Sequence, residues 1–295
     1  MEKEHWIRAD SKKPGIERRE KEGVVYLAYP ALEQTGMVVH GFSTRLGGVS
    51  TGIWSSMNLS YSRGDDPDAV TENYHRIARA IGFPFESLVA SHQTHTTNVQ
   101  AVTEADRGKG IWRERDITDV DGMITNVPNV TLATFYADCV PLYFVDPVRR
   151  AIGLSHSGWR GTVGKMGAET VKAMEKAYGS RPEDIITAIG PSICQDCYEV
   201  SEDVIEAFRE NFEEKDWPGL FYRKENGKYQ LNLWEANKII LLEAGILPEH
   251  ISMPNLCTCC NPQLLFSHRA SHGKRGNLGA FLMLKEEMDG SGRDR

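Results

Sequence analysis

Two apolar runs in the middle of the chain, each leading to a residue that can act in catalysis, constrain the fold more than any other feature. Residues 130–136 (VTLATFY) and 151–154 (AIGL) have the composition of buried strands. The first run leads to Cys139 and the second to His156. An Asp-Pro turn signal at 146–147 separates the two strands. We therefore predict that the cysteine and the histidine meet at one edge of a sheet.

His95, in the sequence Gln-Thr-His at 93–95, is the best candidate for a third member of this group. A single histidine is more often a hydrogen-bonded structural residue, so His95 is chosen because of its proposed partners. Two imidazoles and a thiolate suit Zn²⁺, and three protein ligands leave one coordination position free for chemistry. The residues predict a catalytic zinc site at His95, Cys139 and His156.

The same residues leave two other interpretations open. In a cysteine hydrolase or amidase, Cys139 would be the nucleophile and His156 the base that deprotonates it. In a non-catalytic binding module, zinc would serve only structure, but structural zinc is normally closed by four protein ligands. The Gln-Thr-His element favours a metal over the hydrolase pair.

Composition excludes several classes of function. The chain is 40% hydrophobic and 25% charged, which is ordinary for a globular protein. Its net charge of -7 argues against a nucleic-acid-binding surface. We find no apolar run of the roughly 20 residues that a membrane helix needs and no signal-peptide core. We expect a cytoplasmic protein that binds neither membranes nor nucleic acids.

The alternation of strand and helix patterns, without repeats or linkers, predicts a single α+β domain over residues 23–288. Residues 1–22 are highly charged and are expected to form a mobile N-terminal arm. Residues 289–295 are expected to be a frayed tail.

Two segments have the features of an anion site. A helix is predicted from Gly161 to about Tyr178, and its first amides, its dipole and Arg160 together suit a phosphate. The glycine-rich loop 44–50 allows close backbone approach to a ligand, and its Arg45 can hold an anion. A tight turn with a solvated arginine explains that loop equally well.

The cysteines outside the proposed zinc site have two interpretations. The chain has six cysteines, too few for a dense disulfide framework, so in a reducing compartment they should be thiols or metal ligands. Cys194 and Cys197 have C-x₂-C spacing, and so do Cys257 and Cys260, although Cys259 blurs the second pair. We favour buried or incidental thiols over a Cys₄ zinc site.

Several motifs, in order, resemble the laccase-domain family. Its members were first called multicopper polyphenol oxidases and are now described as zinc-dependent purine nucleoside phosphorylases with adenosine deaminase activity. The resemblance runs from about residue 38 to 284. It rests on residues 40–50 (HGFSTRLGGVS), 58–59 (NL), 93–95 (QTH), 138–141 (DCVP), 156–161 (HSGWRG), 189–193 (IGPSI) and 257–258 (CT).

The resemblance implies a fold and a metal site. The family's metal ligands fall on His95, Cys139 and His156. The implied fold is an α/β/β/α four-layer sandwich related to the cysteine-hydrolase-like superfamily. This chain departs from the family pattern at Ser157, where alanine is usual, and at 268–269, where His-Arg replaces Tyr-Arg. His92 is a further departure, because it is not part of the usual motif.

The implied activity is cleavage of purine nucleosides by phosphate, giving a free base and ribose 1-phosphate, with hydrolytic deamination of adenosine beside it. Adenosine, inosine, guanosine and S-methyl-5′-thioadenosine are the expected substrates. Zn²⁺ would serve the deamination. Asp138 is not assigned as general acid, because in strand geometry its side chain points away from Cys139. The residues expected to bind substrate or phosphate are Arg45, Asn58, Arg160 and Gly161.

The number and spacing of the histidines test the older family name, multicopper polyphenol oxidase. A multicopper oxidase holds its blue and trinuclear copper with about ten histidines, many in His-x-His pairs. This chain has nine histidines in total and no His-x-His pair. We therefore expect zinc and not a multicopper centre.

Overall fold

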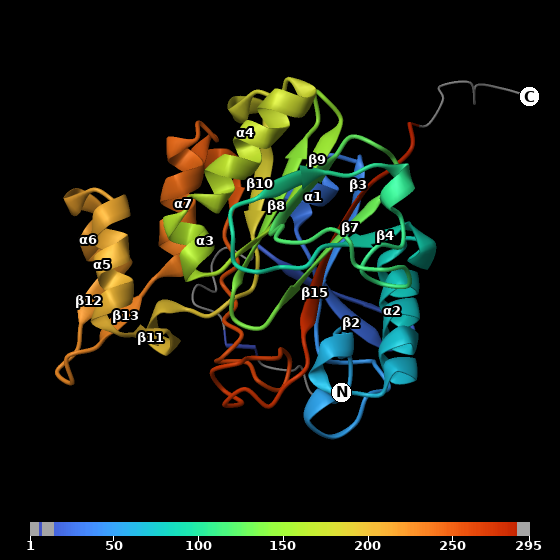
Figure 1. Ribbon diagram of the computed structural model, residues 1–295, viewed down its shortest axis with the longest axis horizontal. Coiled ribbons are helices and arrows are strands. Elements are labelled where there is room, and N and C mark those ends of the chain that lie inside the picture. The colour runs from blue at the N-terminus through green and yellow to red at the C-terminus, as the bar shows by residue number, and fades with distance from the viewer. Residues whose placement is uncertain (1–5, 8–14, 288–295) are drawn as a thin grey trace, which may run out of the picture.

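Two six-stranded sheets packed face to face form the centre of the molecule in the computed structural model, which describes residues 6–7 and 15–287 (Figure 1). The first sheet has the order β1 (Glu17–Lys21), β2 (Val24–Ala28), β3 (Val38–Ser43), β15 (Leu278–Leu284), β7 (Thr131–Tyr136) and β4 (Leu88–Ala90). The second has the order β14 (Ile251–Ser252), β10 (Ile186–Ile189), β8 (Val140–Asp146), β9 (Ala151–Ser157), β6 (Gly122–Thr125) and β5 (Val99–Ala101).

Most neighbouring strands in these sheets are antiparallel. The parallel pairs are β4 with β7 in the first sheet, and β5 with β6 and β10 with β14 in the second. A third, small sheet of β11 (Glu199–Val200), β13 (Tyr229–Leu231) and β12 (Phe221–Arg223) lies to one side. The turn at 226–227 joins β12 to β13 in an antiparallel hairpin.

Helices cover the outer faces of both sheets. The helices of the chain are α1 (Pro30–Glu33), α2 (Pro67–Ile81), α3 (Trp159–Val163), α4 (Met166–Tyr178), α5 (Glu202–Asn211), α6 (Trp217–Leu220) and α7 (Leu233–Glu243). Residues of α2 share a hydrophobic cluster with the first sheet, and residues of α4 and α7 share another with the second. A third cluster lies between the sheets. The layers therefore run α2, first sheet, second sheet, then α4 and α7. This is the predicted single mixed α/β domain; its relation to the cysteine hydrolases stays a prediction.

Strand β8 shows why the central strands have continuous apolar sequences. All seven of its residues are buried. Tyr143 and Val145 face the core between the sheets, while Leu142 and Phe144 face the core beneath the helices. Because side chains alternate between the faces of a strand, a strand covered on both sides must be apolar at nearly every position.

The N-terminal arm differs from the expectation. Residues 17–21 form the edge strand β1, which pairs antiparallel with β2. Arg19 forms ion pairs with Glu17 and Glu33. Charged side chains are typical of edge strands because they discourage pairing with other chains, and they concealed the strand in the sequence. The rest of the predicted arm lies largely outside the described residues, and the predicted tail 289–295 lies wholly outside them.

The helix predicted from Gly161 to Tyr178 is two helices. Helix α3 begins at Trp159 and ends at Val163, and α4 begins at Met166. Lys165 between them has φ of 62°, in the left-handed region that interrupts a right-handed helix. A Cβ on Gly164 would lie 2.6 Å from the Thr97 methyl group. The break thus lets the chain pass close to the loop that carries His95.

Three buried tyrosines tie the two sheets together. Tyr136 on β7 donates a hydrogen bond to the carbonyl of Ser155 on β9, at 3.0 Å. Tyr143 on β8 donates to the carbonyl of Gly41 on β3 at 3.1 Å, and Tyr29 after β2 donates to that of Ile189 on β10 at 2.9 Å. Buried hydroxyls need such partners, so these bonds favour one register of the two sheets.

Within the described residues, no helix is long and apolar enough to cross a bilayer.

His40 is a structural residue in this core. Its Nε2 accepts a hydrogen bond from the Tyr29 amide at 2.8 Å, so the ring is held neutral there. Burial, with smaller contributions from Arg19 and Lys285, lowers the pKa of His40 to about 3. The unfolded chain binds this proton near pH 6.5, whereas the folded chain does not. The stabilisation is therefore present above pH 6.5 and is lost as the pH falls toward 3.

We predict that His40→Gln reduces the loss of stability in mild acid. Glutamine keeps an acceptor for the Tyr29 amide but does not titrate. Between pH 6.5 and 4.5 the wild-type free energy of unfolding should fall more steeply than that of the variant, by up to about 1.4 kcal/mol per pH unit. Urea unfolding at several pH values measures both slopes, and equal slopes would contradict the buried neutral histidine.

Candidate active site

Two chain crossovers between the sheets bring the predicted site together. The loop with Cys139 joins β7 of the first sheet to β8 of the second, and the loop with His95 joins β4 of the first sheet to β5 of the second. His156 lies near the end of β9 and pairs in register with Pro141 on β8. Because β4 and β7 are adjacent and parallel, both crossovers leave the first sheet at the same edge.

The three predicted metal ligands meet there. One ligand atom each of His95, Cys139 and His156 lies within 4.8 Å of the others. The two imidazole rings are nearly perpendicular, at 80°, with centroids 4.9 Å apart. His156 is buried, Cys139 is half-buried and His95 is exposed, so the site is accessible from the side of His95.

Asp121, which the sequence analysis did not single out, organises this site. It is fully buried, and its Oδ1 lies 2.7 Å from Nδ1 of His156. Its Oδ2 accepts hydrogen bonds from the amides of Thr94 and Thr96, at 3.0 and 2.9 Å. One carboxylate therefore orients the His156 ring and holds both neighbours of His95. With Nδ1 bonded to Asp121, Nε2 of His156 is available as a ligand, the usual arrangement around protein-bound zinc.

The Gln-Thr-His sequence has a structural explanation. The Gln93 amide bonds to the backbone of Phe135 in both directions: its oxygen accepts from the amide at 2.8 Å, and its nitrogen donates to the carbonyl at 3.1 Å. This fixes the loop to β7. His95 itself has φ of 66°, an uncommon left-handed conformation. Gln93 and Asp121 together hold His95 in it.

Gly158 completes the pocket because no side chain fits there. A Cβ at this position would lie 2.9 Å from Cδ2 of His95 and 3.2 Å from Sγ of Cys139. The first glycine of the His-Ser-Gly-Trp-Arg-Gly sequence thus leaves room for the ligands to converge.

Electrostatics favour a thiolate at Cys139. Burial alone raises the pKa of this thiol, but His156 and His95 offset the effect and lower the pKa to about 6. Burial lowers the pKa of His156, but the charges of Cys139 and Asp121 outweigh it and raise the pKa to about 9. At neutral pH, without a cation, these groups form a thiolate–imidazolium pair. An ionised sulfur and two convergent imidazoles fit zinc, and three protein ligands leave room for a substrate.

Asp138 lies in the bend between β7 and β8 and not in the strand geometry that the prediction assumes, and hydrogen bonds hold its side chain. Its two carboxylate oxygens accept hydrogen bonds from the Thr258 hydroxyl at 2.6 Å and the Arg269 amide at 2.7 Å. Asp138 has φ of 89°, so the backbone turns between β7 and Cys139. The buried Asp138 thus anchors the crossover. Of the departures from the family pattern, Ser157 bonds to the Thr162 hydroxyl, and His92 is exposed and outside the ligand group.

The residues predicted to bind phosphate differ in their exposure and contacts. Arg160 is exposed and stacks on Trp159, at 4.3 Å from the ring centroid, while Gly161 is buried in the short α3. Arg45 is half-buried, donates to the carbonyls of Ser55 and Pro262, and stacks on Phe266.

Asn58 is fully buried and occupied by the protein itself. Its amide nitrogen donates to Asp65 and its oxygen accepts from the amides of Ser60 and Asn277. These contacts favour a structural role, and its assignment to the substrate stays a prediction.

A basic cavity that the sequence did not reveal adjoins Arg45. It has a volume of about 150 Å³, and its lining includes Arg45, Lys274 and Arg275. Arg275 is buried, and its Nε has no hydrogen-bond partner among the described residues. Burial and the positive charge of Arg63 lower the pKa of Arg275 to about 10, against the opposing charges of Asp138 and Cys139.

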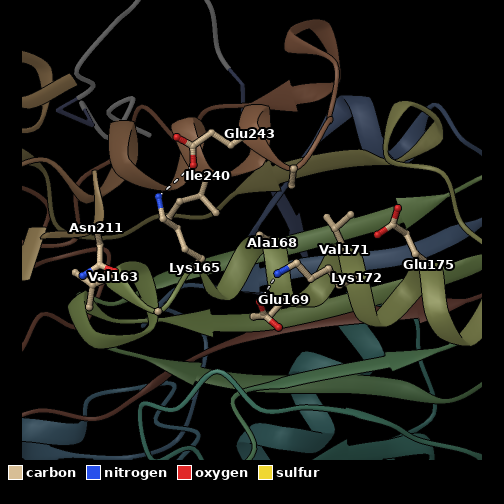
Figure 2. Close-up of a pocket in the computed structure, with 12 residues that line it drawn as sticks. Val163, Lys165, Ala168, Glu169, Val171, Lys172, Glu175, Asn211, Ile240 and Glu243 are labelled. Atoms are coloured by element: carbon tan, nitrogen blue, oxygen red, sulfur yellow. Dashed lines mark hydrogen bonds and ion pairs between the residues drawn. The ribbon is translucent and has the colours of Figure 1, made fainter. Parts of the chain in front are cut away.

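A larger groove, of about 500 Å³, lies on the outside of the second sheet between α4 and α7 (Figure 2). None of the predicted site residues lines it. Lys165 pairs with Glu243 across it, and Lys172 pairs with Glu169 on α4. These charged side chains of the groove thus form ion pairs with one another. The groove is distinct from the site of His95, Cys139 and His156.

Comparisons with known proteins decide the family. A family model described as multi-copper polyphenol oxidoreductase laccase matches residues 39–285. The chain belongs to this family. The purine nucleoside phosphorylase YlmD of Bacillus subtilis is 41% identical over 250 residues, which cover 84% of this chain and 89% of that protein. The human purine nucleoside phosphorylase LACC1 is 34% identical over 84% of this chain and 56% of its own length.

Solved structures of this laccase family have the same fold. The crystal structure of YlmD from Geobacillus stearothermophilus matches with a TM-score of 0.84 at 36% identity, covering 91% of this chain and 98% of that one. That of the Bacillus licheniformis hypothetical protein YfiH matches with a TM-score of 0.85 at 35% identity, covering 91% and 99%. In the described part of this chain, potential metal ligands gather in two groups, His95–Cys139–His156 and a group of four cysteines.

We predict that Asp121→Asn lowers zinc affinity by about 10- to 100-fold, because an amide orients His156 and the 94–96 loop less well. Competition with a chelating dye measures the affinity. Asp119→Asn is the matched control: Asp119 bonds to the Thr94 hydroxyl in the same loop but is not the residue that bonds to His156. Unchanged zinc affinity in folded Asp121→Asn protein would refute the orienting role.

Proposed function

We propose that this protein is a purine nucleoside phosphorylase that splits the N-glycosidic bond with phosphate, releasing the base and ribose 1-phosphate. The observation that carries the proposal is the convergence of His95, Cys139 and His156 at an accessible sheet edge. Relatives that share most of this chain carry the phosphorylase name. Adenosine, inosine, guanosine and S-methyl-5′-thioadenosine are the proposed substrates, and the predicted cytoplasmic location is retained.

Phosphorolysis needs an anion held beside C1′ of the ribose and stabilisation of the charge that develops on the departing base. Arginine side chains can hold the phosphate anion. Arg45 contributes a half-buried charge to the lining of the basic cavity, and Arg275 contributes a buried one. Arg160 lies two residues after Gly158, where an added Cβ would lie 2.9 Å from His95 and 3.2 Å from Cys139. A guanidinium can bind two phosphate oxygens at once, which fixes the orientation of the anion.

Zinc is the metal that the proposal assigns to His95, Cys139 and His156. When bound with three protein ligands it acts as a Lewis acid and lowers the pKa of water toward neutrality, which suits hydrolytic deamination of adenosine. Because Asp121 bonds to Nδ1 of His156, Nε2 of that ring would be the atom that holds the metal. The low pKa of Cys139 supplies the thiolate near neutral pH.

One arrangement in the site favours a second candidate function. Cys139, His156 and Asp121 also have the form of a nucleophile, a base and an orienting carboxylate, as in a cysteine hydrolase. The relatives named above are phosphorylases, so the comparisons give this alternative no support. The identity of the products separates the two.

We predict that the zinc-loaded protein releases hypoxanthine from inosine only when phosphate is present, with ribose 1-phosphate formed in equal amount. Inosine is a better substrate for this test than adenosine, because inosine has no exocyclic amine and its deamination cannot complicate the products. Chromatography of both products measures the reaction. A nucleoside hydrolase would form free ribose without phosphate, and a cysteine amidase would leave inosine intact.

The matched variant for this assay is Cys139→Ser, with Cys259→Ser as the control. Both remove a half-buried thiol, but Cys139 alone belongs to the site. Turnover should be lost in the first and kept in the second. Base release that ignores phosphate, or the absence of turnover with every purine nucleoside in a zinc-replete sample, would refute the phosphorylase.

We further predict that Arg160→Lys raises the phosphate concentration needed for half-maximal rate by about tenfold, because a lysine cannot make the bidentate contact. The melting temperature should not change, since Arg160 is exposed. Arg181→Lys, another exposed arginine, is the control and should behave as wild type. Normal phosphate saturation together with a lower melting temperature would make Arg160 a structural residue.

A further inference from the structure

Four cysteines outside the active site come together from two distant segments. Cys194 and Cys197 follow β10, and Cys257 and Cys260 precede β15. One sulfur of each lies within 4.8 Å of the others. We propose that these four thiolates bind a second metal ion, a structural Zn²⁺ whose coordination positions are all filled by protein.

The spacing of the sulfurs fits a tetrahedral ion. Sγ of Cys260 lies 3.9 Å from that of Cys194 and 3.5 Å from that of Cys197. Zinc–sulfur bonds of about 2.3 Å in tetrahedral geometry separate sulfurs by roughly 3.8 Å. A disulfide would need two sulfurs at about 2.05 Å, which is far shorter than either separation. The cluster can therefore accept zinc with little movement.

Backbone amides point at one of the sulfurs. Sγ of Cys257 accepts hydrogen bonds from the amide of Cys194 at 3.2 Å and from that of Cys260 at 3.4 Å. Amide donors stabilise negative charge on the acceptor, so they suit a thiolate better than a neutral thiol. The bond from Cys260 to Cys257 closes the C-x₂-C turn, and the bond from Cys194 links the two turns. Each C-x₂-C pair thus supplies two ligands, the usual spacing of a Cys₄ zinc site.

The remaining cysteine of the segment, Cys259, lies outside the group of four although it sits between two of its members. The adjacency of Cys259 and Cys260 makes the spacing ambiguous in the sequence, for which incidental thiols are the favoured interpretation. The fold resolves the ambiguity, because it selects Cys260 and not Cys259. Cys259 is therefore a matched control one residue away from a ligand.

The ion would fix a part of the chain that supports the active site. Ser192 and Cys257 form a β-bridge, and the Thr258 amide donates to the Ser192 carbonyl at 3.1 Å. The Thr258 hydroxyl in turn holds Asp138, the residue before Cys139. The cluster thus clamps two segments that position the crossover. Because all four positions are taken by sulfur, this zinc would have no place for substrate and would act only through structure.

The test counts metal and does not depend on activity. Elemental analysis of protein purified with reductant should give two zinc ions per wild-type chain. One should remain in Cys139→Ser, in which the active-site ligand is lost, and one in Cys197→Ser. Cys259→Ser should keep both. Loss of zinc from Cys259→Ser to the same extent as from Cys197→Ser would overturn the assignment of the four ligands.

Cobalt distinguishes the two sites without any change to the cluster, so a cluster variant that fails to fold does not weaken the test. In Cys139→Ser, one bound Co²⁺ should show the intense sulfur-to-cobalt charge-transfer and tetrahedral ligand-field bands of four thiolates. A mercurial reagent that titrates thiols should then release this ion. Cys139→Ser protein that binds neither zinc nor cobalt, or that holds a disulfide within the cluster when prepared with reductant, would overturn the proposal. Either result would leave the phosphorylase assignment untouched.

Discussion

The active site depends on the hydrogen bonds made by the buried carboxylate of Asp121. Its two oxygens bond to His156 on one side and to the amides of Thr94 and Thr96 on the other. A charge buried without partners would be very costly, so the loop and the histidine ring must stay in place to satisfy it. The same hydrogen bonds select the tautomer of His156. The same carboxylate therefore contributes both to the stability of the fold and to the positions of His95 and His156.

The two-sheet architecture explains why the site lies where it does. Chain crossovers between stacked sheets are the places where a backbone leaves one layer and enters the other, and polar residues are tolerated there because the ladder hydrogen bonds end. His95 and Cys139 occupy two such crossovers, and β9 brings His156 to the same edge. The tyrosines that join the sheets hold these layers at a constant distance. One of these bonds ends on Ser155, the neighbour of His156 in the chain.

The two cysteine-containing groups differ in the feature that separates catalytic from structural metal sites. The group with Cys139 has three ligands, one of them exposed. The group of four cysteines is complete by itself. Thr258 links them, since it follows Cys257 and bonds to Asp138. In our interpretation one ion would act on substrate and the other would hold the scaffold that presents it.

The sequence by itself determined the strands and their burial, because continuous apolar runs such as 130–136 and 151–154 fit only a sheet covered on both faces. It also predicted His95, Cys139 and His156 as a group, from their chemistry and motifs. It did not identify β1, whose charged residues conceal an edge strand, nor the break at Lys165, which depends on close approach to Thr97. For the four cysteines, the sequence offered a Cys₄ site as one of two interpretations, and the tertiary structure brought the sulfurs together. Asp121 and Arg275 were identified by the tertiary structure alone. Their roles come from neighbours far away in the chain, and local sequence carries no record of which distant residues a fold will bring within bonding distance.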